Sequence, residues 1–318
     1  MKIPPLCRAL ALLATALLVS TPAGAAPHST ASPLFEALPL ERSSQNHLLV
    51  HAFINGKPAL LTVDTGAPIS AIAIQRREHF GLKTIAAGSE IPQHLNVNGA
   101  VNSVLVAKTL TLGTLNLIDE PLVAIDLRGR QHSARRMDDP VIDGIIGADI
   151  LFPTKAVLDC QKQLLVLKMD PSTPGGVPGF DFRGYRRVPM HVSSGFNLYV
   201  DSAVNGHAGK LMVDTGAFAT LLHSRFLRDM QVPLRGSPFT SSGVNLSDRR
   251  VQLATISRLS IGSLELKGKE VGVIDLAGLI HTGLLDASPP VVGLLGSETL
   301  RRHHGIIDFG TSTLYLKR

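Results

Sequence analysis

Two heptapeptides decide the fold of this sequence: LTVDTGA at residues 61–67 and LMVDTGA at residues 211–217. They start 150 residues apart, and their flanks match as well. Ten of the twenty positions in 48–67 are identical to those in 198–217 without a gap. A chance tripeptide would not bring its flanks along. We therefore predict a duplicated lobe, in which each copy supplies one carboxylate to a shared site.

The duplication continues well beyond the heptapeptides. LTLGTLNL at residues 110–117 matches LSIGSLEL at 259–266, and GIIG at 144–147 matches GLLG at 293–296. These later matches are 149 residues apart instead of 150, which indicates a single-residue deletion in the second copy. The two copies therefore extend over most of the chain.

The residues before each aspartate predict a β-hairpin. Apolar, β-favouring runs flank Asn55-Gly56 and Asn205-Gly206, and Asn-Gly between two such runs is the strongest short-range hairpin signal. The second strand of the hairpin would bring the aspartate to the strand end, where a glycine such as Gly66 permits a sharp turn. The many other short Leu-rich and β-branched runs favour an all-β fold. We expect two homologous β-barrel lobes, related by a pseudo-twofold axis, with short helices.

Changes in composition divide the chain into four segments. Residues 1–26 combine a basic start, an apolar run and small residues near the end, which is typical of a signal peptide that is removed on export. Residues 169–182 are rich in Pro and Gly, as linkers are. We therefore expect lobes at 34–168 and 183–318, and a periplasmic or secreted protein. We expect no membrane insertion, because no later apolar run approaches the roughly 20 residues that span a bilayer.

Composition argues against several classes of function. The net charge is +6, with no Trp and only three Tyr, which is unlike a nucleic-acid binder with aromatic stacking platforms. The arginines form scattered pairs instead of a basic tail. After removal of the signal peptide, Cys160 is the one remaining cysteine, which predicts a buried thiol and no intramolecular disulfide. The sequence contains no familiar metal-ligand spacing, nucleophile elbow or Walker-type loop.

With these motifs in view, the chain resembles the aspartic proteases, both the two-lobed pepsin-like enzymes and the dimeric retropepsins. In that family, an Asp-Thr/Ser-Gly loop is followed, later in each lobe, by two hydrophobic residues and a glycine that thread beside the loop. Here residues 145–147 follow Asp64, and residues 294–296 follow Asp214. The resemblance implies an aspartic-type endopeptidase that acts on peptides or proteins without a metal or a cofactor.

The physical reason for two loops is proton chemistry. Two carboxyl groups a few ångströms apart cannot both ionise at low cost, so the pair shares one proton. The aspartic proteases are themselves the usual example of this behaviour. One carboxylate can then act as general base toward a water molecule, while the other polarises the scissile carbonyl. The resemblance assigns these roles to Asp64 and Asp214 without deciding which of them is the base.

The resemblance also implies roles for the residues that follow each aspartate. These supporting residues are Thr65, Gly66, Ala67, Thr215, Gly216 and Ala217. The threonines would hydrogen-bond to the opposite loop, the glycines would let backbone N–H groups approach the carboxylates, and the alanines would pack beneath. Pepsins usually carry Ser or Thr in place of this alanine, and its hydroxyl donates to the aspartate. Without that donor the charged form is stabilised less, so we expect activity at mildly acidic pH.

Two glycine-bearing stretches are candidates for the flap that covers the substrate. They are residues 96–102 and 241–247, at similar distances after their aspartates. The candidate substrate-contacting residues in them are Asn98, Gly99, Gly243 and Val244. Two flaps would make the chain a fused retropepsin. However, the first flap stretch lacks the Tyr that pepsins carry there. Retropepsins carry an Arg directly after the threaded glycine, and here Ala148 and Ser297 stand at that position.

Two alternatives remain open at this stage. An exported module could keep the fold and its groove but bind peptides without cleaving them, although nothing in the sequence demands loss of either aspartate. The lobes could also pair between two chains. The linker makes pairing within one chain far more concentrated than pairing between chains, which favours a monomer with its lobes paired in cis.

Overall fold

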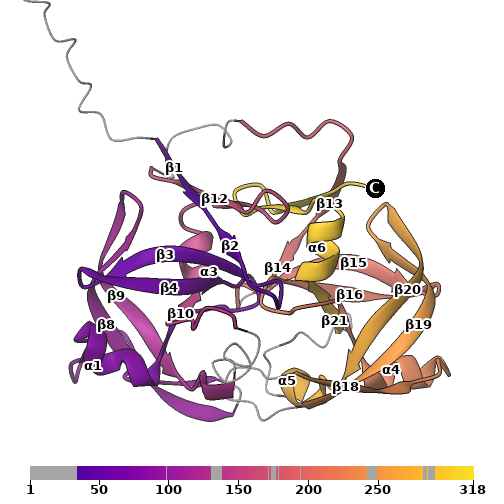
Figure 1. The fold of residues 1–318 in the computed structure, drawn as a ribbon, viewed down its shortest axis with the longest axis horizontal. Coiled ribbons are helices and arrows are strands. Elements are labelled where there is room, and N and C mark those ends of the chain that lie inside the picture. Colours follow the sequence, from indigo (N-terminus) through magenta and orange to yellow (C-terminus); the bar gives the residue numbers. More distant parts are fainter. Residues whose placement is uncertain are drawn as a thin grey trace, which may run out of the picture. The chain divides into compact units, whose positions relative to one another are not determined.

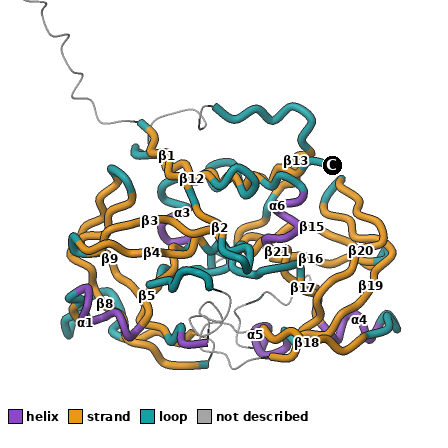
Figure 2. The backbone as a smooth tube through the Cα atoms, in the orientation of Figure 1, coloured by secondary structure: helices purple, strands orange, loops and turns teal. Residues whose placement is uncertain are grey.

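The computed structural model describes residues 34–97, 99–129, 138–170, 172, 177, 179–193, 195–241, 249–281, 285 and 291–318. The predicted signal peptide, residues 1–26, lies outside the described residues. Both repeats belong to one unit, Pro33–Arg318. Figure 1 shows the first repeat in indigo and magenta and the second in orange, and Figure 2 shows that strands dominate both. Below, lobe 1 comprises strands β2 to β10 and lobe 2 comprises strands β14 to β21.

Each lobe contains the hairpin expected from its Asn-Gly pair. In lobe 1 it joins β3 (Leu48–Ile54) to β4 (Lys57–Val63), and in lobe 2 it joins β15 (Leu198–Val204) to β16 (His207–Asp214). The Asn and Gly of each turn have positive φ, 50° and 75° in lobe 1 and 49° and 90° in lobe 2. Two successive positive φ angles are the type I′ geometry that selects Asn-Gly.

Six strands close into a ring in each lobe. The order is β3-β4-β10-β5-β9-β8 in lobe 1 and β15-β16-β21-β17-β20-β19 in lobe 2, with β8 pairing back to β3 and β19 back to β15. The other lobe-1 strands are β2 (Glu41–Arg42), β5 (Ala71–Ala73), β6 (Lys83–Thr84), β7 (His94–Val97), β8 (Ala100–Leu112), β9 (Leu115–Ile125) and β10 (Gly144–Ile146). The other lobe-2 strands are β14 (His191–Val192), β17 (Leu221–His223), β18 (Arg235–Ser241), β19 (Arg249–Ile261), β20 (Leu264–Ile274) and β21 (Val291–Gly296). The prediction of an all-β fold with two homologous barrel lobes is confirmed.

A short strand of each ring, β10 or β21, is called the threaded strand below because it lies between two other strands beside the aspartate loop. It runs parallel to the hairpin strand that leads to the aspartate and antiparallel to the next strand, β5 or β17. Backbones approach closely here: a Cβ on Gly144 would lie 2.3 Å from the Ala71 carbonyl oxygen, and one on Gly293 would lie 2.3 Å from that of Leu221. Glycine at these positions therefore allows the apolar segment to lie beside the aspartate loop.

The helices are short and follow strand ends. They are η1 (Ile74–Arg76), α1 (Arg77–Phe80), α3 (Ala148–Leu151), α4 (Ser224–Asp229), α5 (Ala277–His281) and α6 (Ser297–Arg302). Two of them, α3 and α6, begin directly after the threaded strands, with Gly147 and Gly296 as their N-cap residues. They therefore bring equivalent residues of the two lobes next to the aspartate loops.

A third sheet takes three strands from each half of the chain and connects the lobes (Figure 1). Its order is β1-β12-β11-β22-β23-β13, and the antiparallel pairing of β11 with β22 joins the halves. The bounds are β1 (Phe35–Pro39), β11 (Val157–Asp159), β12 (Leu164–Lys168), β13 (Arg186–Pro189), β22 (Ile306–Asp308) and β23 (Thr313–Leu316). The largest apolar cluster includes residues of this sheet and of both lobes. Because the sheet uses strands from both sides of the linker, the proposed lobe boundaries stay a prediction.

Candidate active site

The two repeated aspartates lie where the hairpin strands end. Asp64 follows β4, and Asp214 is the last residue of β16. The Gly66 N–H donates to Asp64 Oδ1 over 2.9 Å, and the Gly216 N–H donates to Asp214 Oδ1 over 2.8 Å. Asp64 is only 6% exposed. Each carboxylate is therefore held by the backbone of its own loop.

Thr65 and Thr215 connect the two loops by reciprocal hydrogen bonds. The Thr65 N–H donates to Thr215 Oγ1 over 3.0 Å, and the Thr215 N–H donates to Thr65 Oγ1 over 3.1 Å. The Thr65 hydroxyl donates to the Val213 carbonyl, and the Thr215 hydroxyl donates to the Val63 carbonyl, both over 2.8 Å. All four bonds cross from one lobe to the other. They fix the relative position of the two aspartate loops.

The aspartate of one lobe packs against the glycine of the other. A Cβ on Gly66 would lie 2.6 Å from the Asp214 Cγ, and a Cβ on Gly216 would lie 2.2 Å from the Asp64 Oδ2. A side chain at either glycine would therefore displace the opposite carboxylate. Because each glycine also holds its own aspartate, both carboxyl groups lie together at the interface between the lobes.

The short helices α3 and α6 hydrogen-bond to the aspartate loops. The Ala148 N–H donates to the Ala67 carbonyl over 2.8 Å, and the Ser297 N–H donates to the Ala217 carbonyl over 2.9 Å. The Ser297 hydroxyl also donates to the Thr215 carbonyl over 2.8 Å. Ala148 and Ser297 are the first residues of α3 and α6, so they occupy equivalent positions in the two lobes.

A polar network in lobe 1 connects α3 to the threaded strand. The Ser70 N–H and hydroxyl donate to the two carboxylate oxygens of Asp149, over 2.7 and 2.6 Å. The same hydroxyl accepts the Gly147 N–H over 2.9 Å. Burial raises the pKa of Asp149, although the hydrogen bonds from Ser70 oppose this shift. The network therefore contains a buried carboxyl group close to the lobe-1 loop.

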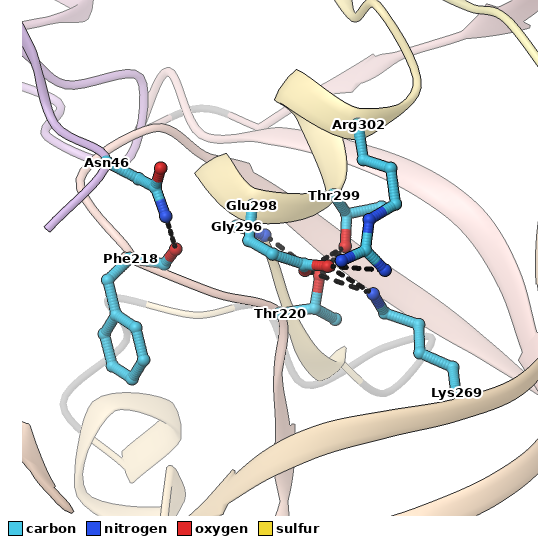
Figure 3. Close-up of polar contacts among 8 residues, drawn as sticks. All are labelled: Asn46, Phe218, Thr220, Lys269, Gly296, Glu298, Thr299 and Arg302. Carbon is cyan, nitrogen blue, oxygen red and sulfur yellow. Dashed lines mark hydrogen bonds and ion pairs between the residues drawn. The ribbon is translucent and has the colours of Figure 1, made fainter. Parts of the chain in front are cut away.

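The matching network in lobe 2 contains a cation (Figure 3). Thr220 Oγ1 hydrogen-bonds to Thr299 Oγ1 over 2.6 Å and accepts a hydrogen bond from the Gly296 N–H over 3.4 Å. The Lys269 ammonium donates to Glu298 Oε1 over 3.0 Å. Burial alone would raise the pKa of Glu298, but Lys269 and the Thr299 hydroxyl bring it below the ordinary value. Lobe 2 therefore holds this carboxylate in its charged form.

A cavity of about 320 Å³ contains Asp64 and Asp214 in its lining. This volume lies at the lower end of the range for ligand pockets. Apolar side chains from both lobes line it: Leu95, Val97, Val123, Ile125, Ile145, Met212, Phe218, Leu221, Ile274, Leu276, Leu279, Leu285 and Leu294. The cavity therefore combines two carboxyl groups with apolar walls, an arrangement that suits a water-activating reaction on a substrate with apolar side chains.

The predicted lobe-1 flap is a hairpin of β7 and β8. Leu95, Asn96 and Val97 of β7 line the cavity. Gly99 lies in the turn with a φ of 82°, and its N–H donates to Asn96 Oδ1 over 2.9 Å, but it is not part of the cavity lining. Asn98 lies outside the described residues. The strand that leads to the turn therefore reaches the cavity.

The predicted lobe-2 flap is described only in part. Thr240 and Ser241, at the end of β18, line the cavity. Gly243 and Val244 lie outside the described residues, so their proposed contact with substrate stays a prediction. The described strand nevertheless reaches the same cavity as β7, from the opposite lobe.

The polar cavity-lining residues that were not predicted from the sequence include His47 and Asn197. They are equivalent, since they lie 150 residues apart, one residue before β3 and β15. His47 Nε2 lies 3.1 Å from the Gly216 carbonyl oxygen of the opposite aspartate loop. Their equal offset from the two aspartates could have revealed them, but their different side chains hide the relationship.

The described residues contain no cluster of three or more His, Cys, Asp or Glu side chains that could hold a metal ion. Among the same residues, no helix is both long enough and apolar enough to cross a membrane. Cys160 is buried, and burial raises the pKa of its thiol to about 12. The thiol is therefore inert at ordinary pH.

Two regions of the chain match a known protein family. The family is described as "Aspartyl protease", and its sequence model matches residues 50–150 and again 200–299. No curated protein sequence matches the chain. Among solved structures, the crystal structure of Basic 7S globulin from soybean aligns with a TM-score of 0.48 at 10% identity, covering 90% of this chain and 95% of that one.

Proposed function

Because the chain belongs to the aspartyl protease family, we propose that it is an aspartic endopeptidase with Asp64 and Asp214 as its catalytic dyad. The observation that carries this proposal is the reciprocal hydrogen bonding of Thr65 and Thr215 across the lobes. A pair of isolated Asp-Gly turns would not need bonds between them. The cavity that contains both aspartates supports the same conclusion.

In the proposed reaction the dyad shares one proton. The ionised aspartate accepts a proton from a water molecule held between the carboxyl groups, and the protonated aspartate donates a hydrogen bond to the scissile carbonyl oxygen. The water oxygen attacks the carbonyl carbon while the protonated aspartate transfers its proton to the carbonyl oxygen, which gives a tetrahedral diol. A proton then passes to the amide nitrogen, the C–N bond breaks, and the amine and carboxylic acid products leave. No covalent bond to the protein forms at any step.

We propose extended peptides with apolar side chains on both sides of the scissile bond as substrates. Val123, Ile125 and Ile145 supply an apolar wall from lobe 1, and Ile274 and Leu294 supply one from lobe 2. Burial of an apolar side chain is worth about 1.5–3 kcal/mol, so such walls select apolar residues.

The proposal includes a monomer, exported to the periplasm or secreted, that is most active at mildly acidic pH. All four threonine hydrogen bonds between the aspartate loops form within one chain, which supports pairing of the lobes in cis. The export proposal is checked by mass spectrometry of the mature protein, which should begin at Pro27. A pH–rate profile with its optimum below about pH 3 would contradict the pH proposal.

The decisive experiment measures cleavage of a mixed peptide library by the wild type and by Asp64→Asn and Asp214→Asn, with and without pepstatin. We expect each substitution to lower kcat by at least about 10²–10⁴-fold, the usual contribution of one acid–base group. Asp201→Asn serves as a matched control, because Asp201 lies on β15 with 73% of its side chain exposed. It should retain wild-type activity.

The same experiment tests the alternative function. Cleavage that survives either dyad substitution would refute the shared dyad. A folded wild type that binds peptides but cleaves none of them between about pH 3 and 7 would indicate an exported peptide-binding module instead of an enzyme.

A further inference from the structure

The two lobes carry opposite charges at one equivalent position under the threaded strands. In lobe 2, Lys269 of β20 forms an ion pair with Glu298 of α6 over 3.0 Å (Figure 3). The 149-residue offset of this part of the repeat equates Lys269 with Glu120 and Glu298 with Asp149. Lobe 1 therefore has two acidic residues where lobe 2 has a base and an acid.

The strand register supports this equivalence. Glu120 of β9 is paired with Ala107 of β8, and Lys269 of β20 is paired with Ile256 of β19. Ala107 and Ile256 are also 149 residues apart. Asp149 is the second residue of α3, as Glu298 is of α6. The backbone thus directs Glu120 toward Asp149 as it directs Lys269 toward Glu298.

No cation compensates for the two acids in the described part of lobe 1. The second partner of Glu298, Arg302 at 3.4 Å, has Pro153 as its counterpart. From α3 through Thr154, Asp149 is the only ionisable residue. On β9 the residues on either side of Glu120 that pack into the apolar core are Leu117 and Leu122, and neither carries a charge. On β8, Lys108 follows the residue paired with Glu120, so it points to the opposite face.

We infer that Glu120 and Asp149 form a second carboxyl pair, which shares one proton and positions the lobe-1 aspartate loop through Ser70 and Gly147. The chain of contacts runs from Asp149 to the Ser70 hydroxyl over 2.6 Å, and from there to the Gly147 N–H over 2.9 Å. Gly147 is followed by Ala148, whose N–H holds the Ala67 carbonyl. A change in the Asp149 carboxylate therefore reaches the loop that carries the dyad.

Glu120 loses its proton in the neutral range. Burial, with a smaller contribution from the Asp149 carboxylate, raises the pKa of Glu120 to about 7. At a pH below the ordinary glutamate pKa of 4.5, Glu120 carries its proton and the folded state keeps its full stability. That stability is lost as the pH rises through the folded-state pKa of about 7. Lobe 1 thus loses stability between about pH 5 and 8. In lobe 2, Glu298 stays charged over this range, since its pKa is lowered.

The first test observes the carboxyl groups by ¹³C NMR in the unliganded protein. Glu120 should titrate near pH 7, and Asp149→Asn should move its midpoint toward the ordinary glutamate value. A wild-type Glu120 midpoint near that ordinary value would overturn the inference. Neither measurement depends on cleavage of any substrate, so an inactive protein would refute the proposed function and leave this inference standing.

The second test compares the thermal unfolding of the wild type with that of Glu120→Lys and Glu120→Gln across pH 5 to 8. We expect the wild-type Tm to fall by about 3 °C or more over this range, and the fall to disappear in both variants. The control is Asp119→Asn, which removes a neighbouring charge and suits the positive φ of 51° at this residue. A Tm that falls equally in Glu120→Gln and in the wild type would overturn the inference.

A third readout rests on the proposed function and separates positioning from simple stability. Well below the Tm, Glu120→Lys should extend the alkaline limb of kcat by a large fraction of a pH unit, with KM unchanged. An alkaline limb identical to that of the wild type, in an active enzyme, would refute the positioning role even if the shared proton were confirmed by NMR.

Discussion

Lobe 1 and lobe 2 form the same hydrogen bonds between their aspartate loops but have different polar residues behind those loops. Where the two aspartate loops hydrogen-bond to each other, the side chains are identical: Thr65 faces Thr215 with bonds that differ by at most 0.1 Å. One layer further back, Ser70 and Asp149 stand where lobe 2 has Thr220 and Glu298. Each threonine must suit both aspartate loops at once, whereas the residues behind the loops need only suit their own lobe. The two copies therefore differ more behind the aspartate loops than between them.

The largest expected effect breaks the identity at the interface itself. Gly216→Ala and Gly66→Ala would place a Cβ 2.2 and 2.6 Å from the carboxyl group of the opposite aspartate. Each variant should lower kcat/KM at least about 10²-fold, since misplacement of a reacting group by about 1 Å costs that much. Steady-state cleavage of a peptide substrate measures the loss.

The control for this pair is Gly236→Ala, because a Cβ on Gly236 would meet no atom within 4 Å. It should retain full activity. If Gly216→Ala were as active as this control, the close packing of each glycine on the opposite aspartate would be wrong.

A second test asks whether the two threonines are energetically equal. Thr65→Ala removes the acceptor of the Thr215 N–H and the donor to the Val213 carbonyl. Leaving these buried groups unpaired should lower the free energy of unfolding by about 2–4 kcal/mol, and Thr215→Ala should cost the same. Urea unfolding followed by circular dichroism measures both values. The Ser variants keep the hydroxyl and should cost much less, and costs that differ widely between Thr65→Ala and Thr215→Ala would contradict the symmetry.

A third test concerns the charge that only lobe 2 contains. Lys269→Met should lower the free energy of unfolding by about 1–3 kcal/mol at pH 7, less than for a fully buried pair because Arg302 still faces Glu298. The pKa of Glu298 is lowered, so its stabilisation exists above the ordinary carboxyl pKa and is lost as the pH falls through the folded value. The cost should therefore shrink toward about pH 3, as measured by denaturant unfolding at several pH values.

The matched control for this prediction is Arg302→Met. Its side chain is 68% exposed and lies 3.4 Å from Glu298, so the loss should stay below about 1 kcal/mol. A larger cost for Arg302→Met than for Lys269→Met would mean that the exposed pair, not the buried one, holds α6.

The smallest effect concerns a surface pair whose polarity is reversed between the lobes. His51 contacts Glu41 over 2.7 Å in lobe 1, and Asp201 contacts His191 over 3.2 Å in lobe 2. The 150-residue offset equates His51 with Asp201, so acid and base have exchanged strands. Because all four side chains are mostly exposed, His51→Asn should change the free energy of unfolding by less than about 1 kcal/mol. A loss above 2 kcal/mol in thermal unfolding would contradict this interpretation.

Much of the fold and the centre of the site followed from the sequence alone. The hairpins could be predicted because Asn55 and Gly56 adopt the positive φ angles that their residue types favour. The position of Asp64 beside residues 145–147 could be predicted from the resemblance, because glycines at fixed intervals report close backbone contacts. The hairpin signal is local in the sequence. The glycine pattern is weak by itself, but its occurrence in both copies makes the prediction strong.

Other features could not be predicted, for physical reasons. The pairing of β11 with β22 joins residues about 150 positions apart, and short apolar strands carry no record of their partner. Glu120 and Asp149 look like ordinary surface acids in the sequence, because only the fold brings these two carboxyl groups near each other. His47 differs in type from its counterpart Asn197, so the repeat did not predict that both residues line the cavity.

The sheet that interleaves both halves of the chain constrains when the protein can fold. β11 finds its partner only after β22 has left the ribosome, since Val157 pairs with Asp308. Until then the first half has an unpaired strand edge, which is a template for aggregation during synthesis. The same interleaving means that a protease cut between β12 and β13 would leave two fragments still bound by the β11–β22 ladder. Separately expressed halves should therefore recognise each other, and neither should be stable alone.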